Sequence, residues 1–313
     1  MSFARKKILS TFLTLFFVVL LVFFAFRIIP GNPALTILGP DASPQQIALL
    51  EKQLGVDKSL TFQFLDWLQG LFVLDFGTSY QYDEPVLSLI GDRIGVTFSL
   101  AIVSMIITLI VALPLGIIAA NYHRKWIDHV ISIGVQFGLA IPTFWSGIIL
   151  IFVFGLIFKL FSVGNYVPIT EDPVQAIKNL FFPALAIAIP QIAIVVRYLK
   201  TTLIEQLTLD YVKTAHSKGL SKMRVLFGHV LKNALIPVVT IIGINFGDIL
   251  AGSLVVEQVF ALPGFGRMLI TAINNRDFPL VQGMVLIISL IAIVINIIVD
   301  FIYRILDPKI SLK

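Results

Sequence analysis

Residues 8–26 read ILSTFLTLFFVVLLVFFAF and carry no charged side chain. As a helix that rises about 1.5 Å per residue, this run of nineteen residues spans roughly 28 Å, close to the hydrocarbon thickness of a bilayer. It follows Arg5, Lys6 and Lys7 and ends next to Arg27. A cleaved signal peptide has a shorter apolar core, of about 7–15 residues, and small residues at its cleavage site. The stretch therefore predicts a retained transmembrane helix.

The whole chain has the composition of a polytopic membrane protein. Of its 313 residues, 58% are hydrophobic and 13% are charged, and the mean hydropathy is +0.96. Soluble domains carry about 25% charged residues, so a soluble fold is excluded. Further apolar runs long enough to cross a bilayer lie at 96–120, 131–158, 180–199, 234–256 and 281–303. We predict an all-α polytopic membrane protein with six transmembrane helices.

Basic residues are concentrated on one side of these predicted spans. With the N-terminus inside, 15 of the 23 Lys and Arg residues fall on the cytoplasmic side, together with five acidic residues. Because cytoplasmic loops of membrane proteins are enriched in Lys and Arg, both termini are expected on the cytoplasmic side of a cell membrane. In this setting the formal net charge of +5 does not indicate nucleic-acid binding.

The connection between the first two spans is extracytoplasmic in this topology and is too long for a simple turn. Ser43-Pro44 is a typical helix start and Gly55 a typical helix end, which predicts a helix at 44–54. A second helix is expected at 60–69. Its apolar face consists of Leu60, Phe64, Trp67 and Leu68. This region is interpreted either as a packed cap on the helix bundle or as a docking surface for an external partner.

A second long connection lies on the cytoplasmic side, and its middle reads as a short amphipathic helix at 210–219. Asp210 can cap its start, and Gly219 can end it in a left-handed conformation. The apolar edge is formed by Tyr211, Val212 and Ala215. A further helix at 222–235 would lead into the fifth span. On these residues alone, a solvated surface helix and a contact site for a cytoplasmic partner both remain open.

Motifs for catalysis, nucleotide binding and metal binding are absent from the sequence. It contains no Gly-x-x-x-x-Gly-Lys-Ser/Thr phosphate loop, no His-Glu-x-x-His and no Gly-x-Ser-x-Gly. There are no cysteines, and all four histidines fall in predicted cytoplasmic connections. We therefore expect no catalytic residue, no metal site and no cofactor held by this chain.

Asp248 is the only acidic residue clearly inside a predicted span. Ionisable residues at membrane depth mark functional sites by default, so Asp248 is a candidate for a translocation path. A packing role, with the carboxyl hydrogen-bonded across the bundle, is the structural alternative. Gly243, Gly247 and Gly252 on the same span would allow another helix to approach closely.

The cytoplasmic segment carries a family resemblance. The sequence Asp210-Tyr-Val-Lys-Thr-Ala-His-Ser-Lys-Gly-Leu-Ser, followed by Val230-Leu-Lys-Asn-Ala-Leu-Ile-Pro237, resembles the EAA loop of ABC importer permeases. More narrowly, it resembles the first permease subunit of dipeptide, oligopeptide and nickel importers, although Lys213-Thr214-Ala215 stands where Glu-Ala-Ala is usual. Further motifs of that subfamily follow in order: Pro30-Gly-Asn-Pro33, Leu54-Gly-Val-Asp-Lys-Ser-Leu60, Asp75-Phe-Gly-Thr-Ser-Tyr80, Pro142-Thr-Phe-Trp145, Val256-Glu-Gln-Val-Phe260, Pro263-Gly-Phe-Gly-Arg267, Asn275-Arg-Asp-Phe-Pro279 and Asp307-Pro308.

The resemblance implies a transport subunit with no catalysis of its own and the fold of type I importer permeases. It divides the chain into a first helix with an extracytoplasmic region at 1–92 and a permease domain at 93–306, with the coupling loop at 205–237. The implied partners are a second permease, two ATPases that bind ATP and Mg²⁺, and an external substrate-binding protein. The residues expected to couple this chain to an ATPase, with the apolar edge in a groove of that partner, are Asp210, Tyr211, Val212, Ala215, Lys218 and Gly219.

The resemblance also implies peptide cargo, with nickel or a metal–chelator complex as the alternative. The residues expected at the outer mouth, in contact with the binding protein, are Glu257, Pro263, Gly264, Gly266 and Arg267. An ion-coupled secondary transporter would show sequence repeats and several buried charges, and a membrane hydrolase would show paired catalytic residues at bilayer depth. Neither pattern is seen in the sequence, so both readings are disfavoured.

Overall fold

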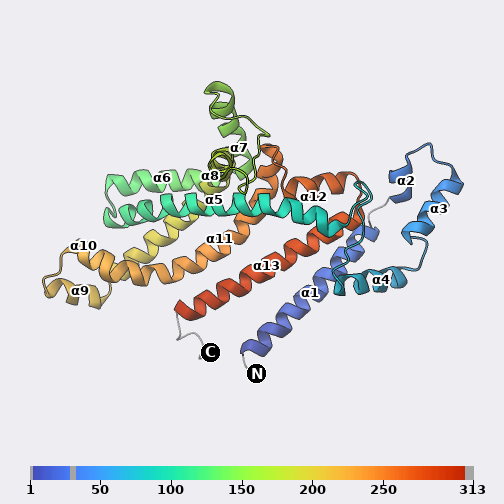
Figure 1. Ribbon diagram of the computed structural model, residues 1–313. Helices are drawn as coiled ribbons and strands as arrows, with labels where there is room; N and C mark the ends of the chain where they lie inside the picture. The colour runs from blue at the N-terminus through green and yellow to red at the C-terminus, as the bar shows by residue number, and fades with distance from the viewer. Residues whose placement is uncertain (1–2, 29–32, 307–313) are drawn as a thin grey trace. The chain divides into compact units, whose positions relative to one another are not determined.

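A computed structural model describes residues 3–28 and 33–306, and in these ranges the chain is helical, with an isolated bridge between Thr78 and Pro85 and no strand (Figure 1). Residues 30–32 of the first subfamily motif and the Asp307-Pro308 motif lie outside the described residues. The chain forms two compact units. Unit 1 consists of residues 1–95 and 264–293, and unit 2 of residues 96–263 and 294–313.

Unit 1 contains the extracytoplasmic region expected from the sequence. Its elements are α1 (Phe3–Ile28), α2 (Pro33–Leu38), α3 (Pro44–Leu54), α4 (Leu60–Phe72), α12 (Phe265–Asn274) and the beginnings of α5 (Val86–Asn121) and α13 (Phe278–Leu306). The predicted helix at 44–54 is confirmed: Ser43 and Gln46 cap each other at its start, and Gly55 ends it with φ of +67°. The predicted helix at 60–69 is confirmed and continues to Phe72. Helices α2 and α12 are not anticipated by the sequence analysis.

The predicted apolar face of α4 packs within unit 1. The ring of Phe23 on α1 is fully buried and lies 5.1 Å from the ring of Phe64 and 5.7 Å from that of Trp67, measured between centroids. Aromatic pairs at this separation stabilise a fold by more than the burial of their surface area alone. Leu60, at the start of the same predicted face, is exposed instead, so the packed part of the face is centred on Phe64 and Trp67.

Unit 2 is a bundle built around the long helix α8 (Pro173–Leu207), which packs against α6, α7 and α11. The elements of unit 2 between α5 and the end of α13 are α6 (Trp126–Ala140), α7 (Thr143–Leu150), the π-helix η1 (Ile151–Ile157), α8, α9 (Asp210–Ser217), α10 (Lys222–Val225), the π-helix η2 (Leu226–Val230) and α11 (Leu231–Val259). Segments α10, η2 and α11 follow one another without a gap, which confirms the expected helical lead into the fifth span.

The apolar helices match the predicted spans in place, with one correction of shape. In the described residues, four helices are long and apolar enough to cross a membrane, and α1 adds a shorter apolar stretch at Leu9–Ala25. The predicted span at 131–158 is not one straight helix, because α6 and α7 meet at an angle of 103°. The break falls at Ile141 and Pro142. Pro142 has no N–H to donate and disfavours a helical conformation at the residue before it.

Candidate coupling helix and transport-path residues

Helix α9 occupies the position of the predicted amphipathic helix. It begins at Asp210, which lies in the first turn, while Leu209 holds the capping position with extended backbone. The expectation that Asp210 caps the helix is therefore wrong. Its carboxylate instead accepts a hydrogen bond from the Lys213 ammonium at 2.8 Å. A negative charge in the first turn is favourable for the helix dipole, but both partners are exposed, so the pair adds little stability.

The end of α9 has the geometry that the sequence predicts. Gly219 adopts φ of +82°, a region that glycine enters without steric cost. The N–H of Gly219 donates to the carbonyl of His216 at 2.9 Å, and the N–H of Leu220 donates to the carbonyl of Ala215 at 3.3 Å. These bonds satisfy carbonyl groups left open at the helix end. The chain then turns directly into α10.

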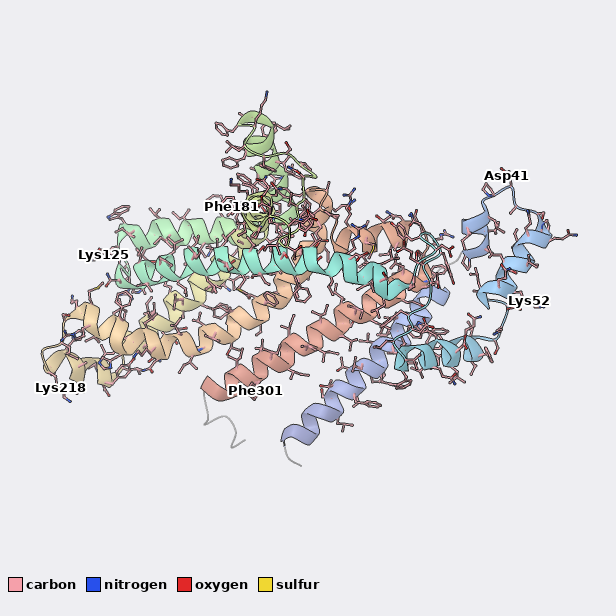
Figure 2. All side chains as sticks on the ribbon, in the orientation of Figure 1. Asp41, Lys52, Lys125, Phe181, Lys218 and Phe301 are labelled. Atoms are coloured by element: carbon pink, nitrogen blue, oxygen red, sulfur yellow. The ribbon has the colours of Figure 1, made fainter. Side chains whose placement is uncertain are left out.

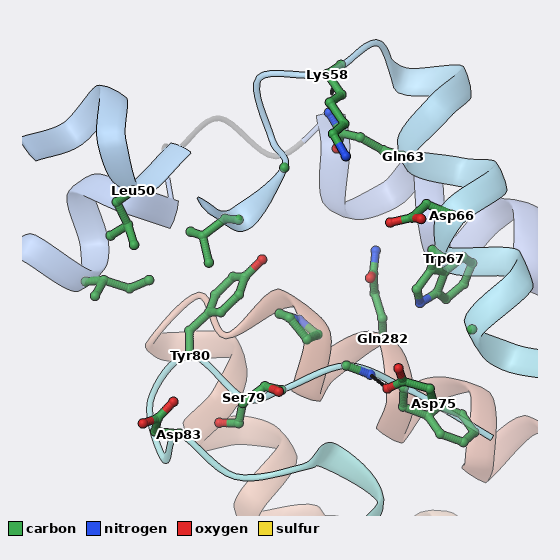
Figure 3. A pocket seen from close by; sticks show the side chains of 18 of the residues that line it. Leu50, Lys58, Gln63, Asp66, Trp67, Asp75, Ser79, Tyr80, Asp83 and Gln282 are labelled. Atoms are coloured by element: carbon green, nitrogen blue, oxygen red, sulfur yellow. Dashed lines mark hydrogen bonds between the residues drawn. The ribbon is translucent and has the colours of Figure 1, made fainter. Parts of the chain in front are cut away.

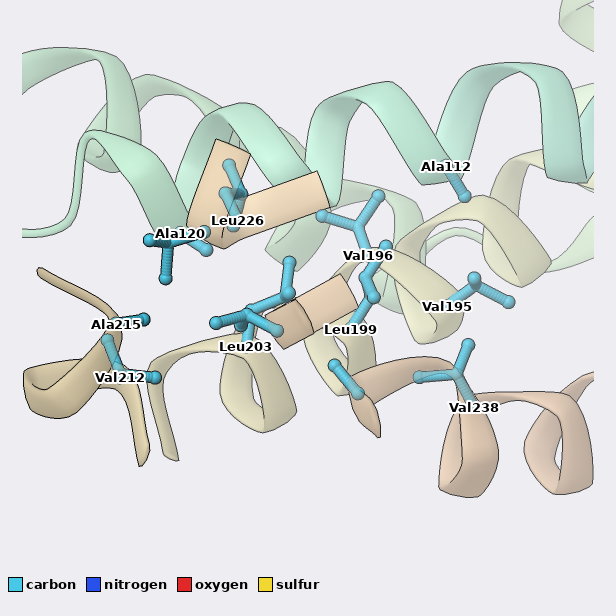
Figure 4. Packing of buried hydrophobic residues seen from close by; sticks show 13 residues of the cluster. Ala112, Ala120, Val195, Val196, Leu199, Leu203, Val212, Ala215, Leu226 and Val238 are labelled. Carbon is cyan, nitrogen blue, oxygen red and sulfur yellow. The ribbon is translucent and has the colours of Figure 1, made fainter. Parts of the chain in front are cut away.

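The apolar edge of α9 is covered by its own chain. Val212 and Ala215 are 3% and 9% exposed, and they belong to a buried apolar cluster, here called the α9 cluster (Figure 4). Its other members near α9 include Ala120 of α5, Leu199 and Leu203 of α8, Val225 of α10 and Leu226 of η2. The half-buried Tyr211 packs on this cluster, and its hydroxyl donates to Oε1 of Gln206 at 2.9 Å.

This packing corrects the expected docking geometry of α9. The edge of Tyr211, Val212 and Ala215 is expected in a groove of a partner, whereas in the structure Val212 and Ala215 are buried in a cluster with α5, α8, α10 and η2 of the same chain. What remains open to a partner is the polar side of the helix, where Asp210, Lys213 and Ser217 are exposed. The exposed Gly219 and Lys218 follow directly, and Lys218 is labelled in Figure 2. A role of these residues in coupling stays a prediction.

A buried carboxylate that the sequence analysis did not single out joins α6 to α8. Asp128 of α6 is 4% exposed and forms an ion pair with Lys200 of α8. Its carboxylate also accepts hydrogen bonds from the backbone N–H of Arg124 at 3.0 Å and from the hydroxyl of Ser132 at 3.2 Å. Lys200 donates to the same hydroxyl at 3.0 Å. The only signal in the sequence is an isolated acid in a basic connection, and its partner lies far along the chain.

Asp248 lies on α11 with an exposed side chain, while the next two residues, Ile249 and Leu250, are buried. The expected close packing around it is confirmed in part. A Cβ atom on Gly243 would come within 2.4 Å of Val299 of α13, so a glycine is needed there for the two helices to approach. A Cβ atom on Gly247 would meet nothing within 4 Å, which contradicts a packing role for that glycine.

Glu257 is not available to an external partner. The side chain, near the end of α11, is fully buried, and its carboxylate accepts a hydrogen bond from the hydroxyl of Thr97 on α5. The expectation that Glu257 contacts a binding protein is therefore wrong, because a carboxylate at a helix end is here enclosed within unit 2. Phe260, three residues further along, is also buried. Its ring packs closely on Gly147, where a Cβ atom would lie only 3.1 Å from it.

The other candidates for the outer mouth differ in their exposure. Gly264 and Gly266 are buried at the start of α12 and Pro263 is half-buried, whereas Arg267 is exposed. A partner can therefore reach the side chain of Arg267 directly but not the buried glycines. The role of these residues at an outer mouth stays a prediction.

A second buried carboxylate organises unit 1. Asp277, between α12 and α13, has a fully buried side chain and accepts hydrogen bonds from the hydroxyl of Ser79 and from the backbone N–H groups of Tyr80, Gln81 and Leu280. The two amides of the 79–81 segment lie 3.1 and 3.2 Å from its oxygens. This set, here called the Asp277 network, joins the Asp75–Tyr80 and Asn275–Pro279 motifs of the subfamily. The only indication of it in the sequence is the Asp within the second motif.

Two family comparisons cover almost the whole chain. Residues 112–312 match the family described as binding-protein-dependent transport system inner membrane component, and residues 1–101 match the corresponding N-terminal family of these membrane components. The chain belongs to the family of binding-protein-dependent transport system inner membrane components. The resemblance drawn from the sequence motifs is thereby confirmed. Membership implies a multi-pass membrane location and, as partners, a substrate-binding protein and an ATPase.

Relatives of this inner membrane component match over nearly their full lengths. A putative peptide transport system permease protein of Brucella abortus (strain 2308) is 35% identical over 305 residues, which is 97% of each chain. The glutathione transport system permease protein GsiC of Salmonella choleraesuis (strain SC-B67) is 36% identical over 313 residues, which is all of both chains.

A solved structure supports the fold. The inward-facing MetNI methionine ABC transporter contains a chain that matches with a TM-score of 0.58 at 18% sequence identity, over 71% of this chain and 97% of that one. At this identity the likeness bears on the fold alone. Together with the apolar helices, it confirms the expected all-α membrane fold of the type I importer permeases.

Proposed function

We propose that the chain is the translocation subunit of an ATP-driven ABC importer that carries short peptides into the cell. The observation that carries this proposal is the match to a peptide permease and to a glutathione permease over nearly the full length of each. Glutathione is itself a tripeptide, so both names point to the same chemical class of cargo. They favour peptides over the alternative of nickel or a metal–chelator complex.

The proposed transporter contains a second, homologous permease, two ATPase subunits and an external substrate-binding protein. The sequence has no phosphate-binding loop, which is consistent with ATP and Mg²⁺ being held by the ATPases. This chain contributes the path for the cargo and the surface through which ATP-driven motion reaches it. It holds no cofactor of its own in this account, and it needs none to bind, orient or release a peptide.

Coupling is assigned to the polar side of α9. Because Val212 and Ala215 are buried against α8 and α10, the helix is fixed to the bundle through its apolar edge. An ATPase that moves the exposed side, at Lys213 and Lys218, would therefore displace α8 and the segment leading into α11 together. ATP binding would then shift the balance between inward-open and outward-open arrangements of the helices.

The translocation path is assigned to the face of α11 that carries Asp248. A carboxylate within a membrane-spanning helix is stable when it faces water or a polar partner, and the side chain is exposed in the isolated chain. Asp248→Asn should leave assembly intact and change transport. Loss confined to cationic cargo would indicate direct contact with cargo, and an equal loss for all cargoes would indicate a role in gating. Normal transport by Asp248→Leu would remove Asp248 from the path.

The proposed topology places both termini in the cytosol with six membrane-spanning helices. The chain has no cysteine, so single cysteines report cleanly on exposure to either side. The exposed positions Gln81, Thr170 and Asn274 should react with an impermeant thiol reagent added outside, and Ser217 should not. Ser79 is unsuitable because its side chain is buried and bonded to Asp277.

Reconstitution tests the function directly. The chain would be purified with its co-purifying subunits and binding protein, and any cargo bound to the binding protein identified by mass spectrometry. The assembly in proteoliposomes should then take up that peptide only with ATP and binding protein present. Recovery of a metal chelate in place of a peptide, with ATP-dependent uptake of the chelate, would favour the nickel-type alternative and contradict peptide transport.

A further inference from the structure

Unit 1 contains a cavity of about 500 Å³ that has no assigned role (Figure 3). It lies among α3, α4, the segment that includes Tyr80, and the first turn of α13. Its volume is in the range of about 300–1,000 Å³ that is typical of small-molecule sites. Apolar and polar groups share its walls, including Leu50, Trp67 and Gln282. A site of this size accommodates two or three amino-acid residues.

Polar groups on the cavity wall are the strongest sign of a missing ligand. The side chain of Gln282 is 5% exposed and projects from α13 into the cavity (Figure 3). Two atoms of other wall residues are buried without a partner: the indole Nε1 of Trp67 and Oε1 of Gln63. Buried polar groups are normally paired. Together these groups offer both donors and acceptors, which is what a peptide group requires.

The orientation of Gln63 is fixed by the protein. Its Nε2 atom donates to the backbone carbonyls of Val56 at 3.1 Å and Lys58 at 2.7 Å. With both N–H groups engaged, the amide presents only its oxygen as an acceptor. A ligand that satisfies the site must therefore bring an N–H donor for Gln63 as well as an acceptor for Trp67.

Opposite charges lie on the α4 side of the cavity. The Lys58 ammonium is 4.4 Å from the centre of the Phe62 ring, and the Asp66 carboxylate projects from the next turn of α4 (Figure 3). Neither group has an ion-pair partner among the described residues. The lining also contains Asp75, whose carboxylate accepts a bond from the N–H of Gly77 at 2.8 Å, and Asp83. The excess of carboxylates favours a positively charged group in the ligand.

The wall opposite α4 is held in place by the Asp277 network. Ser79 and Tyr80 line the cavity, and both are bound to the buried carboxylate of Asp277. A wall fixed in this way loses little conformational freedom when a ligand binds, which favours affinity.

We propose that this cavity binds a short peptide with free ends. The peptide ammonium lies against Asp66, its carboxylate against Lys58, and its peptide groups are hydrogen-bonded by Gln63, Trp67 and Gln282. This inference rests on the proposed function for its cargo class, and it adds a peptide site within this chain, in unit 1. It is distinct from the face of α11 that carries Asp248.

The test uses the full chain in lipid nanodiscs and measures binding of tri-alanine by calorimetry. Binding should be saturable and should weaken at least tenfold for tri-alanine that is acetylated at one end and amidated at the other. Asp66→Asn and Lys58→Gln should each weaken binding about tenfold, because each removes a charged partner. Trp67→Phe, which keeps an aromatic ring beside Phe23, and Gln282→Leu should each weaken it about two- to tenfold.

Matched controls separate the cavity from the general charge of unit 1. Asp41→Asn and Lys52→Gln change exposed residues of the same unit that do not line the cavity, and both should bind tri-alanine normally (Figure 2). Thermal melting confirms folding of each variant. If Gln282→Leu does not fold, the exposed Lys58 and Asp66 variants still decide the outcome.

Several results would overturn the proposal. These are an absence of tri-alanine binding, equal affinity for free and end-blocked peptide, and unchanged affinity in all four cavity variants. The proposal would also be overturned if a loop of the binding protein occupied the cavity and free peptide did not bind there. Peptide uptake that persists unchanged in the cavity variants contradicts this inference and leaves the proposed function standing. Tri-alanine binding in a transporter that imports no peptide contradicts the proposed function and leaves this inference standing.

Discussion

The α9 cluster in unit 2 and the Asp277 network in unit 1 hold their surroundings together in opposite ways. The α9 cluster is apolar and closed, and none of the unpartnered buried polar atoms in the described residues lies on α9. The Asp277 network depends on one buried carboxylate that receives several hydrogen bonds. Beside it lies an open cavity with unpartnered polar groups.

The difference indicates what each region can do. Close apolar packing is non-directional, leaves no polar group unpaired and resists deformation. The α9 cluster is therefore suited to transmit a movement from an exposed helix to the bundle. A hydrogen-bonded carboxylate fixes specific groups in specific directions while leaving space next to them. The Asp277 network therefore suits a surface that recognises a ligand.

The largest expected effect comes from placing a charge in the α9 cluster. Ala215→Arg would bury an unpaired guanidinium beside Val225 and Leu203, which costs at least about 3 kcal/mol. We expect loss of transport and of substrate-stimulated ATPase activity, with a lower melting temperature. Ser217→Arg, on the exposed side of the same helix, is the control and should change the melting temperature little. Equal behaviour of the two variants would show that the cluster does not secure α9.

The Asp277 network should respond next most strongly. Asp277→Ala removes the acceptor for the Ser79 hydroxyl and for three backbone amides, which should destabilise unit 1 by about 1–3 kcal/mol. Hydrogen exchange at Tyr80 and Gln81 should accelerate, while exchange in α9 stays the same. Asp92→Ala, an exposed acid in unit 1, is the control. Unchanged protection of both amides would refute the assigned role of the carboxylate.

A smaller effect is expected at the border of the α9 cluster. Tyr211→Phe removes the hydroxyl that donates to Gln206 and keeps the ring on the cluster, so the expected loss is about 0.5–1.5 kcal/mol. Thermal melting of the assembled transporter measures it, with Tyr122→Phe, at an exposed ring in the same unit, as the control. A loss as large as that of Ala215→Arg would mean that the polar contact, and not the apolar packing, holds α9.

The smallest effect on stability is expected on the polar side of α9. Lys213→Gln breaks an exposed pair with Asp210, which should change stability by less than about 1 kcal/mol. If this side contacts an ATPase, substrate-stimulated ATPase activity should nevertheless fall. An unchanged activity, with normal assembly, would argue that the contact lies elsewhere on the chain.

Regular features governed by local sequence were predicted well. The apolar runs located the long helices, and Ser43 and Gly55 located both ends of α3, because capping depends on residues within one turn. Gly219 likewise ended α9 as expected. The helix at Leu60–Phe72 was predicted to end three residues too early, because no typical capping residue marks its C-terminal end.

Features that depend on distant residues were not predicted. The burial of Val212 and Ala215 could not be read from α9, because an apolar edge looks the same whether its own chain or a partner covers it. Glu257 looked like an exposed helix end and proved to be enclosed, with a hydroxyl from α5 as partner. The pairing of Asp277 with Ser79 joins segments far apart in the chain, and one sequence alone carries no signal for such a contact.

The most direct test of the account is site-specific cross-linking from α9 in the assembled transporter. A single cysteine introduced as Lys218→Cys, carrying a photoreactive maleimide, should form an adduct with the ATPase subunit, because Lys218 lies on the open side of the coupling segment. Ala215→Cys, at a buried position, should form no such adduct. An adduct with the external binding protein from Lys218→Cys, or with the ATPase only from Ala215→Cys, would contradict the account.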